Sequence, residues 1–290
     1  MVRRAVSPRL ESEPAAFYQY PEHLRSSLAD LPSLPGVYVF HGESDSLPLY
    51  IGKSVNIRSR VMSHLRNTDE ARMLRQARRI TFITTAGELG ALLLEAQMIK
   101  IQQPLFNKRL RKNRQLCSLQ ISGTQPTVVY AREVDFSHTP NLFGLYASRR
   151  AALEALEALH NIADEQRLCT GILGLENLRP QRACFRASLG RCAGACCGQE
   201  SMAEHHQRLL SALERVRVQC WPWQGTVGVV EEGVAHKQIH VINNWYYLGS
   251  VEDIAAAGEL TSTPQGFDSD GYKILCKPVI SGKYPIIPLC

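Results

Sequence analysis

The fold of this 290-residue chain is decided by two short runs, Gly36-Val-Tyr-Val-Phe40 and Leu49-Tyr-Ile-Gly-Lys53. β-Branched and aromatic residues dominate both runs, which predicts two strands joined as a hairpin through the turn-like residues 41–48. Ser54 is the expected N-cap of a helix over roughly 55–66, with further helix to about 78. A second β-branched run predicts a third strand over 80–85.

A carboxylate stands on the apolar face of the next predicted helix, over 87–102, which ends before Pro104. Glu95 follows Leu92 by three residues and precedes Ile99 by four, so the three side chains share one face. Burial of a carboxylate is costly unless the group is paired or binds a cation. Glu95 is therefore either a glutamate at the rim of the core, bonded to an arginine, or a metal ligand.

Two basic residues one helical turn apart, Arg60 and His64, form a second candidate pair. At this spacing they can present two donors to one anion, or they belong to an ordinary exposed helix face. The net charge of +6 is modest, but cationic residues crowd two stretches, which suits a phosphate backbone or a solvated basic face. These stretches contain Arg58, Arg60, Arg66, Arg72, Arg75, Arg78 and Arg79, and then Lys108, Arg109, Arg111, Lys112 and Arg114.

The composition argues against a membrane or secreted protein. No window approaches the roughly 18 consecutive apolar residues that a bilayer-spanning helix requires. The arginines near the start are not followed by an apolar run, so no secretory signal is expected. We therefore expect a soluble, cytoplasmic protein with no membrane partner. In such a reducing compartment, the nine cysteines favour metal binding over a disulfide framework.

Five regions are expected along the chain. An irregular, proline-rich arm with a short helix near 22–28 comes first, and the first folded domain follows it. A connecting segment with strand-like stretches leads to a helical, cysteine-rich region that binds metal. The last region is β-rich, and its sequence indicates no role. The expected bounds are 1–32, 33–108, 109–147, 148–220 and 221–290.

Local patterns place several elements in the last two regions. Ser148 is expected to open one amphipathic helix, and a second covers 201–219. A β-prone run predicts a strand over 239–242, and turns are expected at Glu232-Gly233 and Asp270-Gly271. The three tryptophans of the chain, all after residue 220, serve either a protein interface or a core.

Taken together, the hairpin, the basic helix and the Glu95 helix resemble the GIY-YIG nuclease family. The resemblance is to the amino-terminal domain of UvrC in particular, the incision subunit of bacterial nucleotide excision repair. The matching residues are Pro35-Gly-Val-Tyr38, Tyr50-Ile-Gly-Lys53, Arg60, Leu94-Glu-Ala96, Ile99-Lys100 and Asn107. Val37 is a mild variant, and His64 stands where many UvrC proteins have tyrosine. The resemblance implies an α+β domain with a three-stranded antiparallel sheet flanked by helices.

The resemblance also implies hydrolysis of a DNA phosphodiester with one Mg²⁺ or Mn²⁺ ion held by Glu95. Arg60 would hold the scissile phosphate, because its guanidinium fork matches phosphate geometry. One of two tyrosines would accept the proton of the attacking water, with a cation such as Lys53 lowering its pKa. The implied catalytic residues are Tyr38, Tyr50, Lys53, Arg60, His64 and Glu95. The implied substrate-binding residues are Gly52, Asn107, Lys108, Arg109 and Arg111.

Four cysteines with irregular spacing follow the nuclease region. They are Cys169, Cys184, Cys192 and Cys196, with Cys197 directly after the last. Zinc ribbons usually show two tight Cys-x2-Cys pairs, which are absent here, although zinc stays an alternative. Thiolates at irregular spacing suit an iron–sulfur cluster equally well. The run Arg191-Cys-Ala-Gly-Ala-Cys196 resembles the cysteine region of UvrC, which implies a [4Fe–4S] cluster with these four ligands and favours Cys196 over Cys197.

The resemblance extends over roughly residues 30–200. Full UvrC proteins continue with a UvrB-binding motif, a second nuclease domain and helix-hairpin-helix repeats, for which this chain is too short. A short UvrC-like excinuclease is therefore implied, which makes a single incision on the 3′ side of a bulky lesion in damaged double-stranded DNA. UvrB is the implied partner, with UvrA acting upstream. The alternatives are another GIY-YIG endonuclease, of restriction or homing type, and a non-catalytic iron–sulfur DNA-binding protein.

Overall fold

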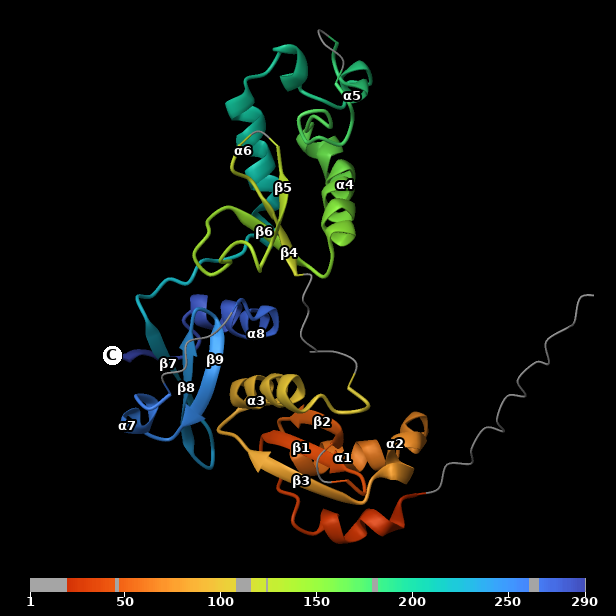
Figure 1. The fold of residues 1–290 in the computed structure, drawn as a ribbon, viewed down its shortest axis with the longest axis vertical. Helices are drawn as coiled ribbons and strands as arrows, with labels where there is room; N and C mark the ends of the chain where they lie inside the picture. Colours follow the sequence, from red (N-terminus) through yellow and green to blue (C-terminus); the bar gives the residue numbers. More distant parts are fainter. Residues whose placement is uncertain are drawn as a thin grey trace, which may run out of the picture. The chain divides into compact units, whose positions relative to one another are not determined.

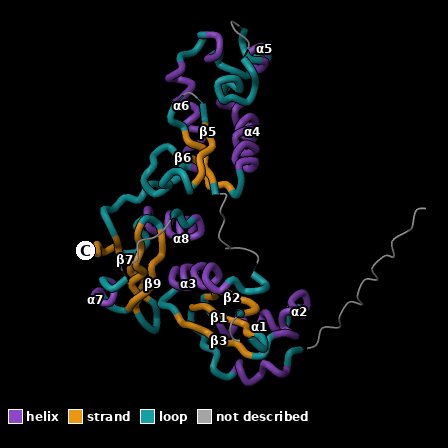
Figure 2. The backbone as a smooth tube through the Cα atoms, viewed as in Figure 1, coloured by secondary structure: helices purple, strands orange, loops and turns teal. Residues whose placement is uncertain are grey.

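The computed structural model describes residues 20–44, 47–107, 116–123, 125–178, 182–260 and 266–289. The chain divides near residue 109 into two compact units. The elements of each unit can be followed in the ribbon of Figure 1 and the tube of Figure 2. Among the described residues, no helix combines the length and the apolar character that crossing a membrane requires.

The first unit is built on the predicted three-stranded antiparallel sheet, which is confirmed in the order β2-β1-β3. The central strand β1 places Tyr38 opposite Gly52 and Phe40 opposite Tyr50 of β2. The strands are β1 (Gly36–His41), β2 (Pro48–Ser54) and β3 (Arg79–Thr84). The helices are η1 (Glu22–Leu28), α1 (Ile57–Leu65), η2 (Thr68–Glu70), α2 (Ala71–Gln76) and α3 (Glu88–Gln102), where η denotes a 3-10 helix.

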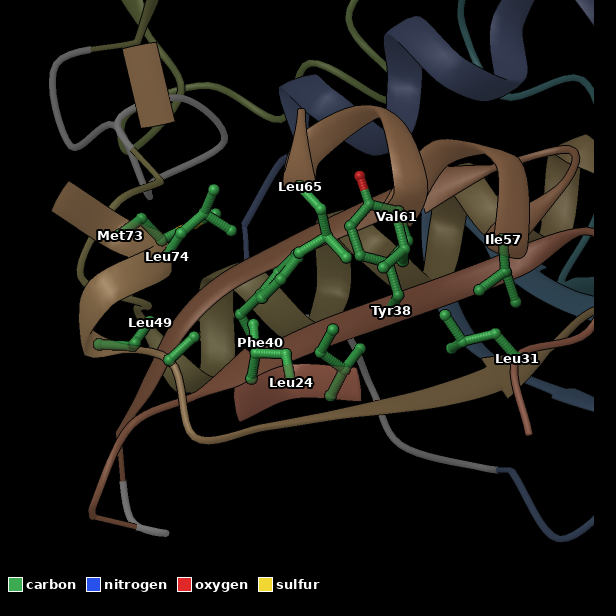
Figure 3. Close-up of a cluster of buried hydrophobic side chains, with 12 residues drawn as sticks. Leu24, Leu31, Tyr38, Phe40, Leu49, Ile57, Val61, Leu65, Met73 and Leu74 are labelled. Carbon is green, nitrogen blue, oxygen red and sulfur yellow. The ribbon is translucent and has the colours of Figure 1, made fainter. Parts of the chain in front are cut away.

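The core of this unit lies between the sheet and its helices, and Figure 3 shows its side chains. Phe40 of β1 and Ile57, Val61 and Leu65 of α1 are wholly buried. Burial of each such side chain is worth about 1.5–3 kcal/mol, so this cluster supplies much of the domain's stability. Leu24 of η1 is also wholly buried in it, so residues of the expected arm contribute to the domain core.

The start of α1 differs from the sequence prediction, which was wrong about the capping residue. Asn56 is the N-cap, because its side-chain oxygen accepts a hydrogen bond from the Ser59 N–H at 2.9 Å. Ser54 is the last residue of β2, and its hydroxyl donates instead to the Asn56 carbonyl at 2.8 Å. Strand β2 therefore continues to Ser54, and helix α1 begins at Ile57, two residues later than expected.

The second unit begins with a small antiparallel sheet of order β5-β4-β6, in the segment that was expected to be a connection. Its strands are β4 (Cys117–Gln120), β5 (Thr127–Tyr130) and β6 (Leu142–Tyr146). Two long helices, α4 (Arg149–Gln166) and α6 (Met202–Leu213), pack with it. Leu119, Phe143, Leu156 and Leu209 belong to their common core. The sheet and the two helices thus form one packed body.

Two helix predictions in this body have different outcomes. Ser148 does cap α4, since its side chain accepts a hydrogen bond from the Ala151 N–H. The predicted helix over 201–219 is too long, because α6 ends at Leu213 and a 3-10 turn, η4 (Glu214–Val216), follows. The next residues leave the helix, and the Val218 N–H bonds to the carbonyl of Leu142, the first residue of β6, at 2.8 Å.

The remainder of the second unit contains a four-stranded antiparallel sheet of order β10-β7-β8-β9, which confirms the β-rich expectation. The strands are β7 (Thr226–Glu232), β8 (Lys237–Asn243), β9 (Tyr246–Val251) and β10 (Ile286–Leu289). The helices are α7 (Ile254–Ala257) and α8 (Ser269–Ile280). Trp221 and Trp245 are buried with ring centroids 5.0 Å apart, so they fill a core.

The turn predicted at Asp270-Gly271 is wrong. Both residues lie in the first turn of α8, where the Asp268 side chain accepts hydrogen bonds from both of their N–H groups at 3.1 Å. An Asp-Gly pair is typical of turns, but a capping aspartate two residues earlier satisfies the same N–H groups and starts a helix.

Candidate active site and cysteine cluster

The two motif tyrosines lie side by side on β1 and β2. Tyr38 is 1% exposed, and its ring centroid is 6.3 Å from that of Tyr50. In Figure 3 the Tyr38 hydroxyl points away from Phe40 and toward α1. A Cβ atom at Gly52 would lie 2.3 Å from the Tyr38 Oη atom, closer than contact allows. Glycine is therefore required at position 52 to make room for the Tyr38 ring.

The pair Arg60 and His64 faces these tyrosines from α1. Nε2 of His64 lies 2.6 Å from the Tyr38 hydroxyl, and the imidazole is 4% exposed. Arg60 is more exposed, and its guanidinium interacts with the Tyr38 and Tyr50 phenols. The structure thus excludes an ordinary solvent-facing arrangement for His64 and leaves Arg60 at the mouth of the site.

Glu95 reaches the same region from α3. Its Oε1 atom accepts a hydrogen bond of 3.1 Å from the Lys53 N–H of β2. Among the described residues, no protein group bonds to its Oε2 atom. In that part of the chain no arginine bonds to Glu95, although Arg60 lies near enough to lower its pKa, and one carboxylate oxygen is left for another ligand. The Lys53 ammonium is engaged elsewhere, 2.6 Å from Oε1 of Glu88.

Burial dominates the electrostatics of this site. It raises the pKa of Tyr38 and of Tyr50, and the nearby Arg60 guanidinium only partly opposes it. In the protein alone the Lys53 ammonium pairs with Glu88, and Arg60 is the cation that lowers the tyrosine pKa values, so an effect of Lys53 on them stays a prediction. Burial also raises the pKa of Glu95. The hydrogen bond from the Lys53 N–H and the positive charges of Lys53 and Arg60 lower it, but by less. A cation bound to Glu95 would favour its ionised form.

Asn107, which closes the family motif, bonds to the backbone of β2. Its Oδ1 atom accepts from the Ile51 N–H at 3.0 Å, and its Nδ2 atom donates to the Ile51 carbonyl at 2.8 Å. Ile51 lies between Tyr50 and Gly52, so the Asn107 side chain holds the motif segment of β2 in place. The other predicted DNA-binding residues, Lys108, Arg109 and Arg111, lie outside the described part of the chain.

Asn107→Ala should lower the free energy of unfolding by about 1–3 kcal/mol, because both polar backbone groups of Ile51 lose their partner. Urea unfolding at equilibrium measures this change. Gln102→Ala removes an exposed side chain nearby and is the matched control, which should unfold like the wild type. An Asn107→Ala variant as stable as that control would contradict this structural role.

One polar residue of the site gave no signal in the sequence. Glu70, the last residue of η2, contacts Nδ1 of His64 through its Oε2 atom. The two residues are six positions apart, a spacing that belongs to neither a helix face nor a strand face. They meet because the chain turns between α1 and η2, which periodicity does not predict.

The four predicted cysteine ligands converge in the second unit. The Sγ atoms of Cys169, Cys184, Cys192 and Cys196 all lie within 4.8 Å of one another. Two short helices, α5 (Phe185–Ser188) and η3 (Ala195–Cys197), belong to the surrounding segment. The neighbouring Cys197 is exposed and outside this set, so Cys196 is the ligand candidate of the adjacent pair. His205 of α6 accepts a hydrogen bond of 2.9 Å from the Cys169 N–H.

Comparison with known families divides the chain into three matched parts. Residues 34–108 match the UvrC-like GIY-YIG domain, and residues 116–215 match the middle domain of UvrC/Cho excinucleases. Residues 226–290, whose sequence indicated no role, match the C-terminal domain of excinuclease Cho.

The likeness to one group of relatives runs over the whole chain. Excinuclease cho from Escherichia coli (strain K12) is 66% identical over 289 residues, which cover 100% of this chain and 97% of that protein. The chain belongs to the excinuclease Cho family. Excinuclease cho from Salmonella typhi is 65% identical, with 100% and 98% covered. As a Cho family member, the chain is a UvrC-like GIY-YIG endonuclease of nucleotide excision repair.

Likeness to UvrC itself is partial. UvrABC system protein C from Synechococcus sp. (strain CC9311) is 33% identical over 202 residues, which cover 66% of this chain and 30% of that protein. A crystal structure of the GIY-YIG N-terminal endonuclease domain of UvrC from Thermotoga maritima, bound to magnesium, is 33% identical. It covers 29% of this chain and 93% of that chain, with a TM-score of 0.27. The part of the chain that resembles UvrC is its nuclease and middle domains, because residues 34–108 and 116–215 match UvrC-type family models.

Proposed function

We propose that this Cho family member makes a single, metal-dependent incision on the 3′ side of a bulky lesion in double-stranded DNA. It acts in the cytoplasm with UvrB, and UvrA acts upstream. The observation that carries the proposal is the meeting of Tyr38 and Tyr50, Arg60 and His64, and Glu95 from two strands and two helices around one point. Together these residues can bind a metal ion, hold a phosphate and take up a proton, which are functions that assist phosphodiester hydrolysis.

Glu95 is the proposed ligand of one Mg²⁺ or Mn²⁺ ion. A partly buried carboxylate with one oxygen on the Lys53 N–H and the other without a protein partner among the described residues fits a hard divalent cation. Bound there, the ion would stabilise negative charge on the scissile phosphate and on the leaving oxygen. Lys53 contacts α3 at two points: its N–H bonds to Glu95, and its ammonium pairs with Glu88 at the start of the helix. Both contacts help to keep Glu95 in place.

The remaining residues act on DNA and water. Arg60, at the mouth of the site, binds the scissile phosphate through its guanidinium fork. The tyrosine pair, with His64, takes up the proton of the attacking water. Gly52 and Asn107 keep the β2 backbone close to the substrate, and the cationic run of Lys108, Arg109 and Arg111 follows the phosphate backbone. Positive charge in that run suits non-specific attraction to damaged DNA of any sequence.

The two alternatives fit less well. A restriction or homing enzyme needs a domain that reads sequence, whereas this chain matches the UvrC/Cho middle domain after its nuclease domain. A non-catalytic DNA-binding protein has no need for Glu95, Arg60 and the tyrosines in one place. Membership of an excinuclease family over the whole chain favours the repair incision.

Incision of a duplex with one bulky lesion, with and without UvrB, tests the proposal. We expect one cut on the 3′ side of the lesion in the damaged strand, dependent on Mg²⁺ or Mn²⁺ and on UvrB, when products are mapped to the nucleotide. A cut on the 5′ side would contradict the proposed polarity. Sequence-dependent cutting of undamaged DNA would instead support the restriction or homing alternative.

The cysteine cluster is proposed to hold a [4Fe–4S] cluster through Cys169, Cys184, Cys192 and Cys196. Support comes from the convergence of the four sulfur atoms and from the resemblance of the Arg191–Cys196 run to UvrC. Zinc is the second candidate, because sulfur atoms within 4.8 Å of one another also suit a single tetrahedral ion. Either centre would brace the segment between α4 and α6 and take no part in cutting.

Cys192→Ser should lose the bound metal almost completely, because one ligand in four is removed from a closed site. Cys197→Ser is the matched control and should keep it, since Cys197 is exposed and outside the sulfur set. Metal content and visible absorption of protein prepared without oxygen measure the outcome, and brown protein with iron and sulfide is expected. Colourless protein with one zinc per chain would replace the cluster by zinc, and metal loss in Cys197→Ser would contradict the ligand set.

A further inference from the structure

A chain of hydrogen bonds leads from the candidate active site into the turn after α1. The Tyr38 hydroxyl lies 2.6 Å from Nε2 of His64, and Nδ1 of the same ring contacts Oε2 of Glu70. The second carboxylate oxygen of Glu70 accepts a hydrogen bond of 3.1 Å from the Asn67 side chain. Solvent hardly competes for the ring, since His64 is 4% exposed. Two of these residues, Asn67 and Glu70, lie outside the family motif.

The chemistry of these groups sets the direction of each hydrogen bond. An ionised carboxylate can only accept hydrogen bonds. Nδ1 of His64 must therefore be protonated, and its N–H donates a hydrogen bond to Glu70. Burial lowers the pKa of His64, and Glu70 only partly opposes this, so the ring is neutral at physiological pH. A neutral imidazole protonated on Nδ1 has a lone pair on Nε2. The Tyr38 hydroxyl therefore donates to Nε2, and its oxygen presents lone pairs to the rest of the site.

We propose that Glu70 is a positioning residue for DNA cleavage: it holds His64 in the tautomer that can take the proton of Tyr38. The inference rests on the proposed nuclease function, and it adds that Nε2 of His64 receives the proton. Without Glu70, the ring could rotate or carry its proton on Nε2. It would then donate to Tyr38 and accept nothing from it.

The proton transfers balance as follows. The Tyr38 oxygen takes a proton from the attacking water while its own proton moves to Nε2 of His64. One O–H bond of water and the O–H bond of Tyr38 break, and a new O–H bond on Tyr38 and an N–H bond on His64 form. The electron pair released on the water oxygen forms the bond to phosphorus, and the bond between phosphorus and the leaving oxygen breaks. That oxygen keeps the bonding electron pair and takes a proton from solvent. The resulting imidazolium lies against the Glu70 carboxylate, which stabilises its charge.

The transfer of the proton to His64 avoids the cost of a buried phenolate at Tyr38. A free phenolate is unfavourable at Tyr38, because burial raises its pKa and Tyr50 raises it further. When the proton moves on to His64, no phenolate has to persist. Among the described residues, the charged groups that act on His64 are Glu70 on η2 and Arg60 on its own helix, and the rings of Tyr38, Phe40 and Tyr50 pack against it from the sheet.

The tautomer can be read directly by NMR on the full wild-type chain. Long-range proton–nitrogen correlation with ¹⁵N-labelled histidine distinguishes a protonated ring nitrogen from a bare one, and His64→Gln assigns the signal. We expect the Nδ1 of His64 to be protonated and the Nε2 to be bare. A ring protonated on Nε2 would overturn the inference, whether or not the chain cuts DNA.

Glu70→Gln tests the effect on cleavage. The amide keeps the size but loses the charge, and it can donate to Nδ1 and so favour the wrong tautomer. Single-turnover cutting should slow by about 10- to 100-fold, while the affinities for DNA and for Mn²⁺ stay at wild-type values. Asp69→Asn is the matched control. Asp69 is exposed and directly precedes Glu70, so this variant removes one negative charge at almost the same place. That variant should cut like the wild type.

The outcomes separate the inference from the function on which it rests. Glu70→Gln cutting at the wild-type rate, or an equal loss in Asp69→Asn, would overturn the positioning role while the nuclease assignment stands. A loss confined to DNA or metal affinity would also overturn it, since a positioning role acts on the chemical step. A wild-type chain that cuts no DNA would refute the proposed function instead, and the NMR measurement would still decide the tautomer.

Discussion

Glu95→Gln should cut DNA about 1,000-fold more slowly than the wild-type chain, because a metal at the scissile phosphate supplies several kcal/mol and each 1.4 kcal/mol or so is a factor of ten. Glutamine keeps the size of the side chain and can still accept the hydrogen bond of the Lys53 N–H, so the fold is preserved. The charge that holds the cation is lost. Single-turnover cutting of a lesion-containing duplex in Mg²⁺ and in Mn²⁺ measures the change.

Binding measurements and a control complete this test. The affinity of Glu95→Gln for DNA should persist in fluorescence anisotropy, because the basic side chains are unchanged. Glu22→Gln serves as the control: it removes a carboxylate whose partner among the described residues is Arg25 on an exposed face, where an ion pair is worth little. If Glu95→Gln cut DNA at the rate of this control, Glu95 would not be the metal ligand.

Arg60→Lys should slow cutting by about 100-fold, since lysine keeps the positive charge but offers no planar fork to the phosphate. The effect should fall on the rate of the chemical step, because charge on the phosphate grows in the transition state. DNA affinity should change much less. Single-turnover rates at saturating enzyme, compared with binding measured separately, divide the two effects.

The control for Arg60 is a second arginine near it. Arg66 caps the end of α1 and is exposed, so Arg66→Lys should cut at close to the wild-type rate. If Arg60→Lys weakened DNA binding and left the chemical step unchanged, Arg60 would belong to the binding surface and have no role at the scissile phosphate.

Much of the nuclease site could be predicted from the sequence because its residues lie on regular elements. Alternation on β1 and β2 places Tyr38 and Tyr50, and helical spacing places Arg60 beside His64 and Glu95 near Ile99. The ion pairs and hydrogen bonds between residues of different elements were harder to predict. The pairing of Lys53 with Glu88 depends on how α3 packs on the sheet, and no local pattern reports that.

Less of the second unit could be predicted, for similar reasons. Strands β4 and β5 have four residues each, too short for clear alternation, so strand-like stretches were expected in the connecting segment but a sheet was not. Asp268 acts as a helix cap only because α8 continues beyond it, and an Asp-Gly pair after it favours a turn when seen alone. The convergence of the four cysteines rests on loop paths, for which family resemblance was the only guide.

Anomalous X-ray scattering from Mn²⁺ tests the central claim most directly. Crystals of the full chain with a DNA duplex and Mn²⁺, measured near the manganese edge, should show one manganese peak in the first unit. We expect it about 2.1 Å from a Glu95 carboxylate oxygen, beside the scissile phosphate. Two peaks about 3.5–4 Å apart would mean a two-metal mechanism. A peak that is not bonded to Glu95 would contradict the one-metal site proposed for this nuclease.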